Sequence, residues 1–560
     1  MSGLPADSKQ AQRPAAAGDA AADDLVHRLE ELNAIGASLS AERDINRLLE
    51  SILAAAKTIT RADGGTLYRL TEERTLRFEI VRTTSLKYYL GGTSGNPVPF
   101  YPIHLIGKDG KPNHGMVAAY AALTGQTVNI PDAYTADGFD FSGTRNFDKK
   151  TGYRSTSFLT VPMKNHENEI IGVLQLINAT HPRTGEIVAF SPSDQRLAES
   201  LASQAAIALT NRMLINQLEE LFESFIGLIN MAIDEKSPYT GGHCQRVPAL
   251  TMMLAEAVNE TREGPLADFA MSDKDRYELK IAGLLHDCGK VTTPVHVVDK
   301  STKLETIFDR IHQIDTRFEV LKRDAEIALL KEKALLAARG APPAEHDAAD
   351  ARHRERLRRL DEDRAFLRAC NIGGEAMSEA DMDRVRAIAR YRWTDISGHE
   401  ANFLSEDEVK NLTIRAGTLT QEERQVINHH IVATIKMLEA LPWPRHLKNV
   451  AEYAGGHHER MDGKGYPKGL TREQMSVQAR VMGIADIFEA LTARDRPYKK
   501  GKTLSESLEI LGKFRLNGHI DPDLFDVFIR RKVYRRYADL FLDQDQIDEV
   551  DEARIPGFKP

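Results

Sequence analysis

The chain has 560 residues, which at about 150 residues per domain predicts roughly three or four folded units. Its 74 Lys and Arg residues face 82 Asp and Glu residues, and the formal net charge of -8 excludes a global basic field for nucleic acid. The cysteines, Cys244, Cys288 and Cys370, form no CxxC pair, which argues against a disulfide framework or a thiolate zinc site. No stretch is apolar enough for a leader or a membrane span, so we expect a cytoplasmic protein without membrane insertion.

The N-terminal part predicts a tail followed by helix. Residues 1–24 are Ala, Gly, Pro and polar residues without periodicity, which is typical of a disordered tail. From residue 25 to about residue 60 apolar residues recur at helical spacing, until Asp63, Gly64 and Gly65 break the pattern.

Alternating patterns then predict strands. Leu76, Phe78 and Ile80 lie two residues apart and indicate one face of a strand. Residues 157–163 and 170–178 flank a turn-rich segment and predict a hairpin. Helix, antiparallel strands and a closing helix together favour an α+β domain.

Residues 25–210 resemble a GAF domain. The similarity lies in residues 129–134, 147–153 and 172–178. It implies a sensory domain of the subclass that regulates phosphodiesterases and cyclases by binding a cyclic nucleotide, and the candidate ligand residues are Asp148, Thr151 and Tyr153. The alternative is a domain that only dimerises and binds no ligand.

Residues 193–235 predict one long connecting helix. Apolar residues in its second half alternate steps of four and three, the spacing of a coiled-coil seam, at Leu214, Leu218, Leu221, Phe225, Leu228 and Ala232. We expect a parallel homodimer joined along this helix, which would carry a change in the sensory domain to the next domain. The alternative is a helix packed on its own domain.

Histidine and aspartate residues follow at helix ends. After His243, a helix opened by Ser272 and Asp275 as a capping box runs to His286 and Asp287. An unpaired carboxylate at the end of a buried helix is costly, and a metal ion would offset that cost. The two oxygens of an aspartate can also bridge two metals.

The second half of the chain adds ligands of the same kind. A capping box of Thr420 and Glu423 opens a helix with adjacent histidines, a histidine pair precedes a glycine-rich loop, and Ser476 opens a helix with two acids three residues apart. These chemistry-bearing residues are His429, His430, His457, His458, Asp486 and Glu489. Over the whole chain, five histidines and two aspartates are too many for one structural zinc, and too oxygen-rich and thiolate-free for a zinc finger. They suit two divalent ions, with Lys290 as a point charge for phosphate.

This ordered set resembles the HD-GYP family of metal-dependent phosphohydrolases. The similarity covers residues 225–302 and 418–530 and rests on His286-Asp287 with Gly289-Lys290, on His457-His458-Glu459, and on Gly465-Tyr466-Pro467. It implies an all-α domain over residues 225–535 that hydrolyses cyclic di-GMP to pGpG, GMP or both. The family uses two divalent metals, for which iron and manganese are the candidates.

The resemblance also implies individual roles. One metal would be held by His243, His286, Asp287 and Asp486, and the other by His430, His457, His458 and the shared Asp287, while Lys290, Gly465, Tyr466, Arg496 and Lys499 would contact substrate. Asp287 and Lys290 would serve the chemistry directly. Tyr239 stands where relatives with a third metal carry a carboxylate, so we expect two metals. Glu489 replaces the usual Asp, and Cys288 an aliphatic residue.

An insertion over residues 302–417 departs from the family. From Leu304 to Ala328 apolar residues keep four-and-three spacing, and after residues 340–343 Leu357, Leu360 and Leu367 offer a return face. This predicts a charged helical hairpin, which is either a solvated spacer or an element that dimerises or covers the site. Residues 536–560 are expected to form a C-terminal extension.

The sequence therefore predicts a GAF-regulated cyclic di-GMP phosphodiesterase with a binuclear metal centre. Two alternatives remain: a phosphohydrolase for another cyclic dinucleotide or phosphoester, and a catalytically silent metal-binding signalling protein.

Overall fold

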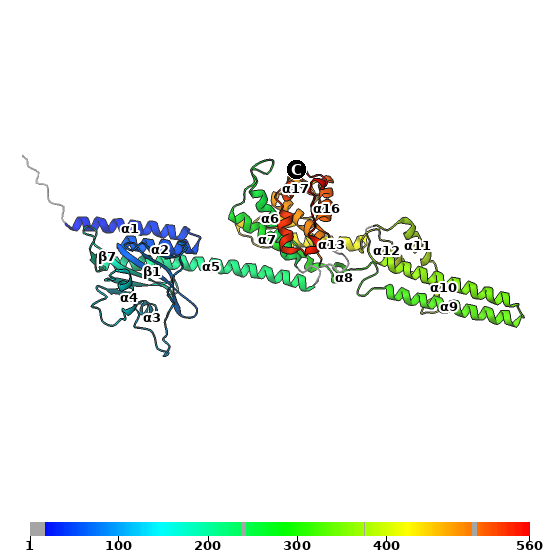
Figure 1. The fold of residues 1–560 in the computed structure, drawn as a ribbon, viewed down its shortest axis with the longest axis horizontal. Coiled ribbons are helices and arrows are strands. Elements are labelled where there is room, and N and C mark those ends of the chain that lie inside the picture. Colours follow the sequence, from blue (N-terminus) through cyan, green and yellow to red (C-terminus); the bar gives the residue numbers. More distant parts are fainter. Residues whose placement is uncertain (1–16, 237–241, 375, 495–500, 560) are drawn as a thin grey trace, which may run out of the picture. The chain divides into compact units, whose positions relative to one another are not determined.

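The structure is a computed structural model that describes residues 17–236, 242–374, 376–494 and 501–559. It divides into two compact units, Met1–Leu221 and Phe222–Pro560, which we describe separately (Figure 1). No helix within the described ranges combines the length and the apolar composition that crossing a membrane requires.

Unit 1 is built on an antiparallel sheet of eight strands. The central order is β3-β2-β1-β7-β6-β5, with β4 beside β2 and β8 beside β7. The predicted hairpin is confirmed, because β6 and β7 pair from Phe158 with Ile177 to Lys164 with Ile170. The strands are β1 (Ala62–Leu70), β2 (Thr75–Thr83), β3 (Tyr88–Gly91), β4 (Ile103–His104), β5 (Val128–Ile130), β6 (Phe158–Lys164), β7 (Ile170–Thr180) and β8 (Ile187–Val188).

The helices of unit 1 complete the predicted α+β fold. Leucines of three of them, such as Leu39, Leu53 and Leu201, share one buried core with Leu159 and Leu174 of the sheet. The helices are α1 (Ala17–Ala41), α2 (Ile45–Thr60), α3 (Val117–Thr124), α4 (Ser142–Thr151) and α5 (Pro192–Lys236).

The N-terminal expectation needs two corrections. Helix α1 begins at Ala17, so the predicted tail of residues 1–24 is wrong from that residue onward, and residues 1–16 lie outside the described residues. The expected helical stretch from 25 to 60 is two helices, because Asp44 caps α2 by accepting a 2.9 Å hydrogen bond from the Arg47 amide. A side-chain cap competes with a continuous helix at that point.

Helix α5 is the long connecting helix that the sequence predicted. Leu197 and Leu201 near its start are buried in the core of unit 1. Ile226 and Ile233 near its end are buried in the core of unit 2. The same helix is therefore a structural member of both units.

Unit 2 is a mostly helical bundle. Both predicted capping boxes are present, at Ser272 and at Thr420, and Ser476 caps the helix that it was expected to open. The bundle helices are α6 (His243–Asn259), α7 (Asp273–Leu285), α8 (Val295–Val298), α13 (Gln421–Glu439), α14 (Val450–Gly455), α15 (Val477–Thr492), α16 (Leu504–Leu516), α17 (Pro522–Arg530) and α18 (Val533–Phe541), with 3-10 turns η2 (Cys288–Thr292), η3 (Arg445–Leu447), η4 (Arg472–Gln474), η5 (Gln544–Gln546) and η6 (Glu552–Arg554).

The C-terminal residues belong to this bundle. A boundary at residue 535 would cut α18, and Tyr537, Ile555 and Phe558 are buried in the bundle core. The expectation of a separate extension over residues 536–560 is therefore wrong. The reason is packing: these apolar side chains complete the core that α6 and α15 begin.

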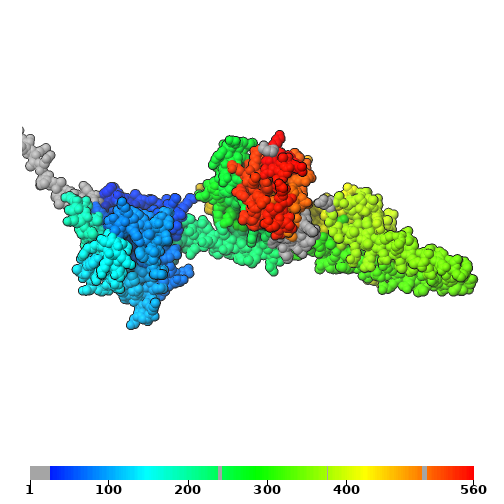
Figure 2. Space-filling model, in the orientation of Figure 1, coloured from blue at the N-terminus to red at the C-terminus, as the bar shows by residue number. Residues whose placement is uncertain are grey.

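The insertion contains the predicted hairpin and a small cap of further elements. Its two long helices lie side by side, and their joint surface is the yellow-green rod of Figure 2. Leu304 is buried, but Ile307 is 93% exposed and the helix begins only at Ile311. The elements are α9 (Ile311–Ala338), α10 (Pro343–Asn371), α11 (Glu379–Ala389), β9 (Arg392–Thr394), β10 (Glu400–Asn402) and α12 (Glu406–Leu412).

The two ends of the insertion are joined at its base. The Thr418 hydroxyl donates a 2.9 Å hydrogen bond to the Lys300 carbonyl. The Lys300 side chain is only 1% exposed, and its ammonium donates to Asn411 of α12 and to Glu423 of α13, each at 2.8 to 2.9 Å. A buried lysine thus ties the base of the insertion to the bundle.

Candidate metal centre

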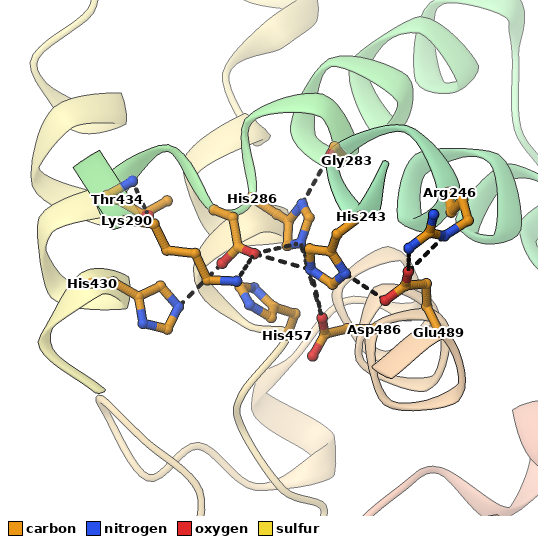
Figure 3. Close-up of polar contacts among 12 residues, drawn as sticks. His243, Arg246, Gly283, His286, Lys290, His430, Thr434, His457, Asp486 and Glu489 are labelled. Atoms are coloured by element: carbon orange, nitrogen blue, oxygen red, sulfur yellow. Dashed lines mark hydrogen bonds and ion pairs between the residues drawn. The ribbon is translucent and has the colours of Figure 1, made fainter. Parts of the chain in front are cut away.

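Five elements of unit 2 carry the predicted metal ligands to one place (Figure 3). His243 begins α6, Asp486 lies in α15, and the others sit after α7, in α13 and after α14. Three overlapping sets bring candidate ligand atoms within 4.8 Å of one another: His243 with His286 and Asp287, His286 with His457 and Asp486, and His430 with His457 and His458. All seven predicted ligands belong to these sets.

Three of the histidines are oriented in the same way. Each Nδ1 donates to the backbone carbonyl three residues earlier, His286 to Gly283 at 2.7 Å, His430 to Ile427 at 2.5 Å and His457 to Ala454 at 2.6 Å. A carbonyl oxygen only accepts, so the proton is on Nδ1. The lone pair of each Nε2 is therefore available to a metal.

His243 is oriented by a carboxylate instead. Its Nδ1 lies 2.5 Å from Glu489 Oε2, and Arg246 Nε donates to the other Glu489 oxygen at 2.8 Å. Carboxylates commonly hold metal-binding imidazoles in this way. From the sequence we identified Glu489 as a second acid at a position where the resembled family usually has Asp, but we assigned no contact to it and no role to Arg246. The available signal was that each lies three residues after a predicted ligand on the same helix.

Asp287 lies between the two groups of histidines. Its Oδ1 is 3.2 Å from His430 Nε2, and its Oδ2 is 3.0 Å from His243 Nε2 and 3.3 Å from His286 Nε2. Oδ2 also accepts from the Lys290 ammonium. One oxygen directed to each group is the arrangement that a bridging carboxylate requires.

Charge around Asp287 favours its ionised form. Burial alone would raise its pKa, but the Lys290 ammonium and His286 outweigh burial and hold that pKa well below its usual value. Burial would likewise lower the pKa of Lys290, yet Asp287 raises it. Lys290 therefore carries its positive charge beside the cluster at neutral pH.

The donor set fits divalent metal ions. Among the described residues, the buried Nε2 of His457 and Oδ1 of Asp287 have no hydrogen-bond partner. Burial lowers the pKa of His457 well below its usual value and that of His458 to about 4, so both imidazoles are neutral at pH 7. Buried acceptors without donors cost about 1 to 3 kcal/mol each. A bound cation would satisfy several of these acceptors at once.

A close contact explains Gly289, which follows the His-Asp pair. Turn η2 packs against α13, where the Gly289 amide donates to the Thr434 hydroxyl at 2.9 Å. A Cβ atom at Gly289 would lie 2.0 Å from the His430 carbonyl oxygen. Only glycine allows the approach that brings Asp287 to His430.

The glycine-rich loop is held against the cluster. The buried Glu459 carboxylate accepts from the amides of Lys468 at 2.7 Å and Leu470 at 2.9 Å. The Tyr466 ring stacks on His458 with centroids 4.8 Å apart. A Cβ at Gly465 would lie 2.4 Å from the Arg460 amide nitrogen, so the loop needs glycine there. Tyr466 is thus placed beside the candidate ligands, as a substrate contact would be.

Two other expectations concern the choice between His429 and His430 and the predicted substrate contacts. His430 is buried in the cluster and His429 is exposed. The predicted substrate contacts Arg496 and Lys499 fall in residues 495–500, outside the described residues.

Unit 1 contains a cavity of about 430 Å³, and one of the three candidate ligand residues lines it. Tyr153 lines it, whereas Asp148 and Thr151 are absent from its described lining. Asp148 is buried and accepts from the Tyr134 hydroxyl and from the amide and hydroxyl of Ser155, each at 2.8 Å. Thr151 donates back into its own helix at 2.9 Å. Asp148 therefore has a structural role and Tyr153 alone faces the cavity.

Sequence comparison gives the family of each part. Residues 44–209 match the GAF domain family, and residues 240–369 and 406–524 match HD domain families. The GAF match contains the antiparallel sheet, and the HD matches contain all seven candidate ligands.

Relatives match shorter stretches. A cyclic di-GMP phosphodiesterase of Pseudomonas aeruginosa is 37% identical over 116 residues, which are 21% of this chain and 27% of that protein. A 3′3′-cGAMP-specific phosphodiesterase of Vibrio cholerae is 43% identical over 81 residues, 14% of this chain and 19% of the relative. A cyclic di-GMP phosphodiesterase of Thermotoga maritima is 33% identical over 134 residues, which are 23% of this chain and 35% of that protein. The chain thus spans well under half the length of these relatives.

Fold, site and sequence agree on the organisation of the chain. It carries an N-terminal GAF domain and a C-terminal region of HD-domain sequence whose relatives include cyclic di-GMP phosphodiesterases.

Proposed function

We propose that unit 2 hydrolyses a phosphodiester bond of a cyclic dinucleotide, with cyclic di-GMP as the first candidate and pGpG, GMP or both as products. The observation that carries this proposal is the convergence of five histidines on Asp287 and Asp486 beside a charged Lys290. The phosphodiesterase relatives support the reaction class.

The ligand sets divide around Asp287. His243, His286, Asp287 and Asp486 would hold one ion, and His430, His457, His458 and Asp287 the other. Two divalent ions there supply activation of water and stabilisation of charge on phosphorus. Imidazole and carboxylate ligands suit iron and manganese.

Other residues serve the substrate. The Lys290 ammonium lies at the ligand cluster and offers a point charge to a phosphate oxygen. The half-buried ring of Tyr466, fixed by its stacking on His458, offers an aromatic face to a base. Arg496 and Lys499 are proposed as further phosphate contacts on the basis of the sequence resemblance.

The test is product chromatography with full-length protein loaded with ferrous or manganous ion and incubated with cyclic di-GMP. We expect pGpG or GMP from the parent, and loss of activity in Asp287→Asn and His430→Ala. His429→Ala is the matched control, because the neighbouring ring is exposed and should leave turnover within about twofold of the parent. A metal-loaded parent that gives no product, or equal losses at His429 and His430, contradicts the proposal.

A second candidate substrate is 3′3′-cGAMP. The Vibrio cholerae relative that is named for this substrate is 43% identical to this chain over 81 residues. The ratio of kcat/KM for the two cyclic dinucleotides, measured in the same preparation, decides between them. Metal binding without turnover of either would favour the catalytically silent alternative.

We also propose a homodimer along α5. The seam predicted from the heptad spacing is solvent-exposed in the single chain: Leu214 is 47% exposed, Leu218 63%, Leu221 55%, Phe225 59% and Leu228 57%. Exposed leucines at coiled-coil spacing favour a second copy as the partner. Light scattering should give twice the chain mass for the parent and the single mass for Phe225→Glu. A monomeric parent contradicts the dimer.

A further inference from the structure

The end of α5 contacts the turn that follows the candidate ligand Asp287. The Lys236 ammonium, on the last residue of α5, donates to the Val291 carbonyl at 2.5 Å and, more weakly, to the Lys290 carbonyl at 3.4 Å. Both carbonyls belong to η2, which begins directly after Asp287. The long connecting helix therefore ends against the turn that follows a candidate ligand and carries its neighbouring cation.

The packing of α5 directs Lys236 toward the bundle. Ile226 and Ile233 lie seven residues apart, on one side of the helix, and both are buried in the core of unit 2. Lys236 follows Ile233 by three residues, so its side chain projects from the same side. At the other end of this stretch, Glu223 accepts a 2.9 Å hydrogen bond from Lys280 of α7. Two polar contacts thus flank the apolar pair, one with α7 and one with η2.

Turn η2 is held at its start, in its middle and at its end. At its start the Lys290 amide donates to the Asp287 carbonyl at 2.9 Å. In its middle the Gly289 amide donates to the Thr434 hydroxyl of α13. The last carbonyls of a short helical turn lack donors within the turn, and a lysine ammonium can satisfy them. Lys236 does so at the end of η2.

The backbone of η2 sets the position of the charge on Lys290. The Lys290 side chain extends from η2 into the ligand cluster, where its ammonium donates to Asp287 (Figure 3). The Lys290 carbonyl and the carbonyl of the next residue accept from Lys236. A misplacement of about 1 Å at an active site can lower a rate by roughly a hundredfold. Freeing the end of η2 should therefore weaken the interaction of Lys290 with a phosphate and remove no metal ligand.

We propose that Lys236 is a positioning residue, which fixes η2 through the Val291 and Lys290 carbonyls and so places the charge of Lys290. Because α5 begins in the core of unit 1, the contact also gives that unit a physical route to the site. A shift of α5 by one residue, about 1.5 Å along its axis and about 100° around it, would carry the ammonium away from η2. The effect on hydrolysis rests on the function proposed for unit 2, whereas the contact with η2 does not.

Hydrogen exchange in the full-length protein tests the contact without relying on activity. Lys236→Met keeps most of the apolar stem and removes the donor, so the amides of residues 289–293 should exchange about tenfold faster than in the parent. Lys236→Arg keeps a cationic donor and should return this exchange to within about twofold of the parent. Glu223→Gln weakens the other polar contact of α5, with Lys280, and is the matched control that should leave exchange in η2 unchanged.

Binding of inorganic phosphate to the manganese-loaded protein tests the consequence. Calorimetry should give about tenfold weaker phosphate binding in Lys236→Met, with both manganese-binding steps unchanged. In the background of Lys290→Met the same substitution should cause no further loss, because it acts through Lys290. Exchange in η2 that Lys236→Met leaves unchanged, or that Glu223→Gln raises equally, overturns the proposal. An equal loss of phosphate affinity with and without Lys290 also overturns it. A parent that shows the expected differences but hydrolyses no cyclic dinucleotide refutes the proposed function alone.

Discussion

Glu489 allows a test of the metal centre that removes no ligand. Its carboxylate is 1% exposed and lies between His243 Nδ1 at 2.5 Å and Arg246 Nη2 at 2.6 Å. Glu489→Gln keeps the volume and an oxygen that can accept from Nδ1, but it removes the charge and places an amide NH2, which cannot accept, against Arg246. The expected result is weaker metal binding at the site that contains His243.

The magnitude follows from the kind of hydrogen bond that is lost. A hydrogen bond to a charged group contributes about 1.5 to 3 kcal/mol, and a neutral one about 1 kcal/mol. The difference of about 1 to 2 kcal/mol corresponds to roughly 5- to 30-fold in affinity, since about 1.4 kcal/mol is tenfold. This agrees with the 10- to 100-fold typical of outer partners of metal ligands.

The assay is calorimetric titration of metal-stripped, full-length protein with manganous ion. We expect one of two binding steps to weaken in Glu489→Gln and the other to stay. Glu509→Gln, which removes an exposed acid paired with Lys513, is the control and should change neither step. If Glu489→Gln binds as the parent does while His243→Ala weakens one step, the carboxylate does not support the ligand, and the reasoning is refuted.

Three further predictions concern packing, pH and the loop. Lys300→Met should lower the free energy of unfolding of unit 2, measured in urea, by about 3 kcal/mol, because it breaks the buried ion pair with Glu423. The control Lys410→Met breaks an exposed ion pair with Glu422 and should cost at most about 1 kcal/mol. Equal losses in the two variants would contradict this prediction. Burial works to raise the pKa of Asp315, but Arg368 holds that pKa below its usual value of 3.8. Asp315→Asn should therefore lower stability at pH 7, and the difference in stability from the parent should vanish as pH falls through the folded-state pKa. A difference that does not depend on pH would contradict this assignment. Glu459→Gln should raise KM for the dinucleotide and leave manganese affinity unchanged, because Glu459 holds the loop and not the ions; unchanged KM would argue against a substrate role for the loop.

The candidate site could be predicted because its chemistry is written in short motifs. Residues such as His286, Asp287 and His457 could be recognised by their type, their order and their position at helix ends, and each belongs to a set whose ligand atoms lie within 4.8 Å of one another. The support for these ligands was harder to predict. The contact between Glu489 and His243 joins residues that are far apart in the sequence, and no local pattern reports such a contact.

The fold was predictable where periodicity was local and failed where packing decides. Capping boxes at Ser272 and Thr420 depend on residues three apart and were confirmed. The burial of Phe558 depends on a core built from distant helices, so its sequence neighbourhood gave no sign of it. The same holds for the GAF cavity, where Asp148 lies in a matching motif yet is turned away and bound by Ser155.

A long insertion separates the ligands of the metal site in the sequence, so something must hold the two groups of ligands in place relative to each other. The ligands before it are His243, His286 and Asp287, and the others follow it. The two ends meet at the base of the insertion, where the Lys303 ammonium donates to the Ile414 carbonyl at 2.8 Å and Thr418 donates to the Lys300 carbonyl. Because the ends meet, the insertion connects the two parts of the bundle as a short link would. The entropic cost of closing a loop also grows only slowly with its length.

The same contacts give the insertion a route to the site. Lys300 binds Glu423, which lies in the first turn of α13. That helix also carries His430, two turns further on. A displacement of the insertion that pulled on Lys300 would therefore act on the ligand that faces Oδ1 of Asp287. For this reason the Lys300→Met variant should be assayed for manganese affinity as well as for stability. If the insertion is only a solvated spacer, the substitution should leave both manganese-binding steps unchanged.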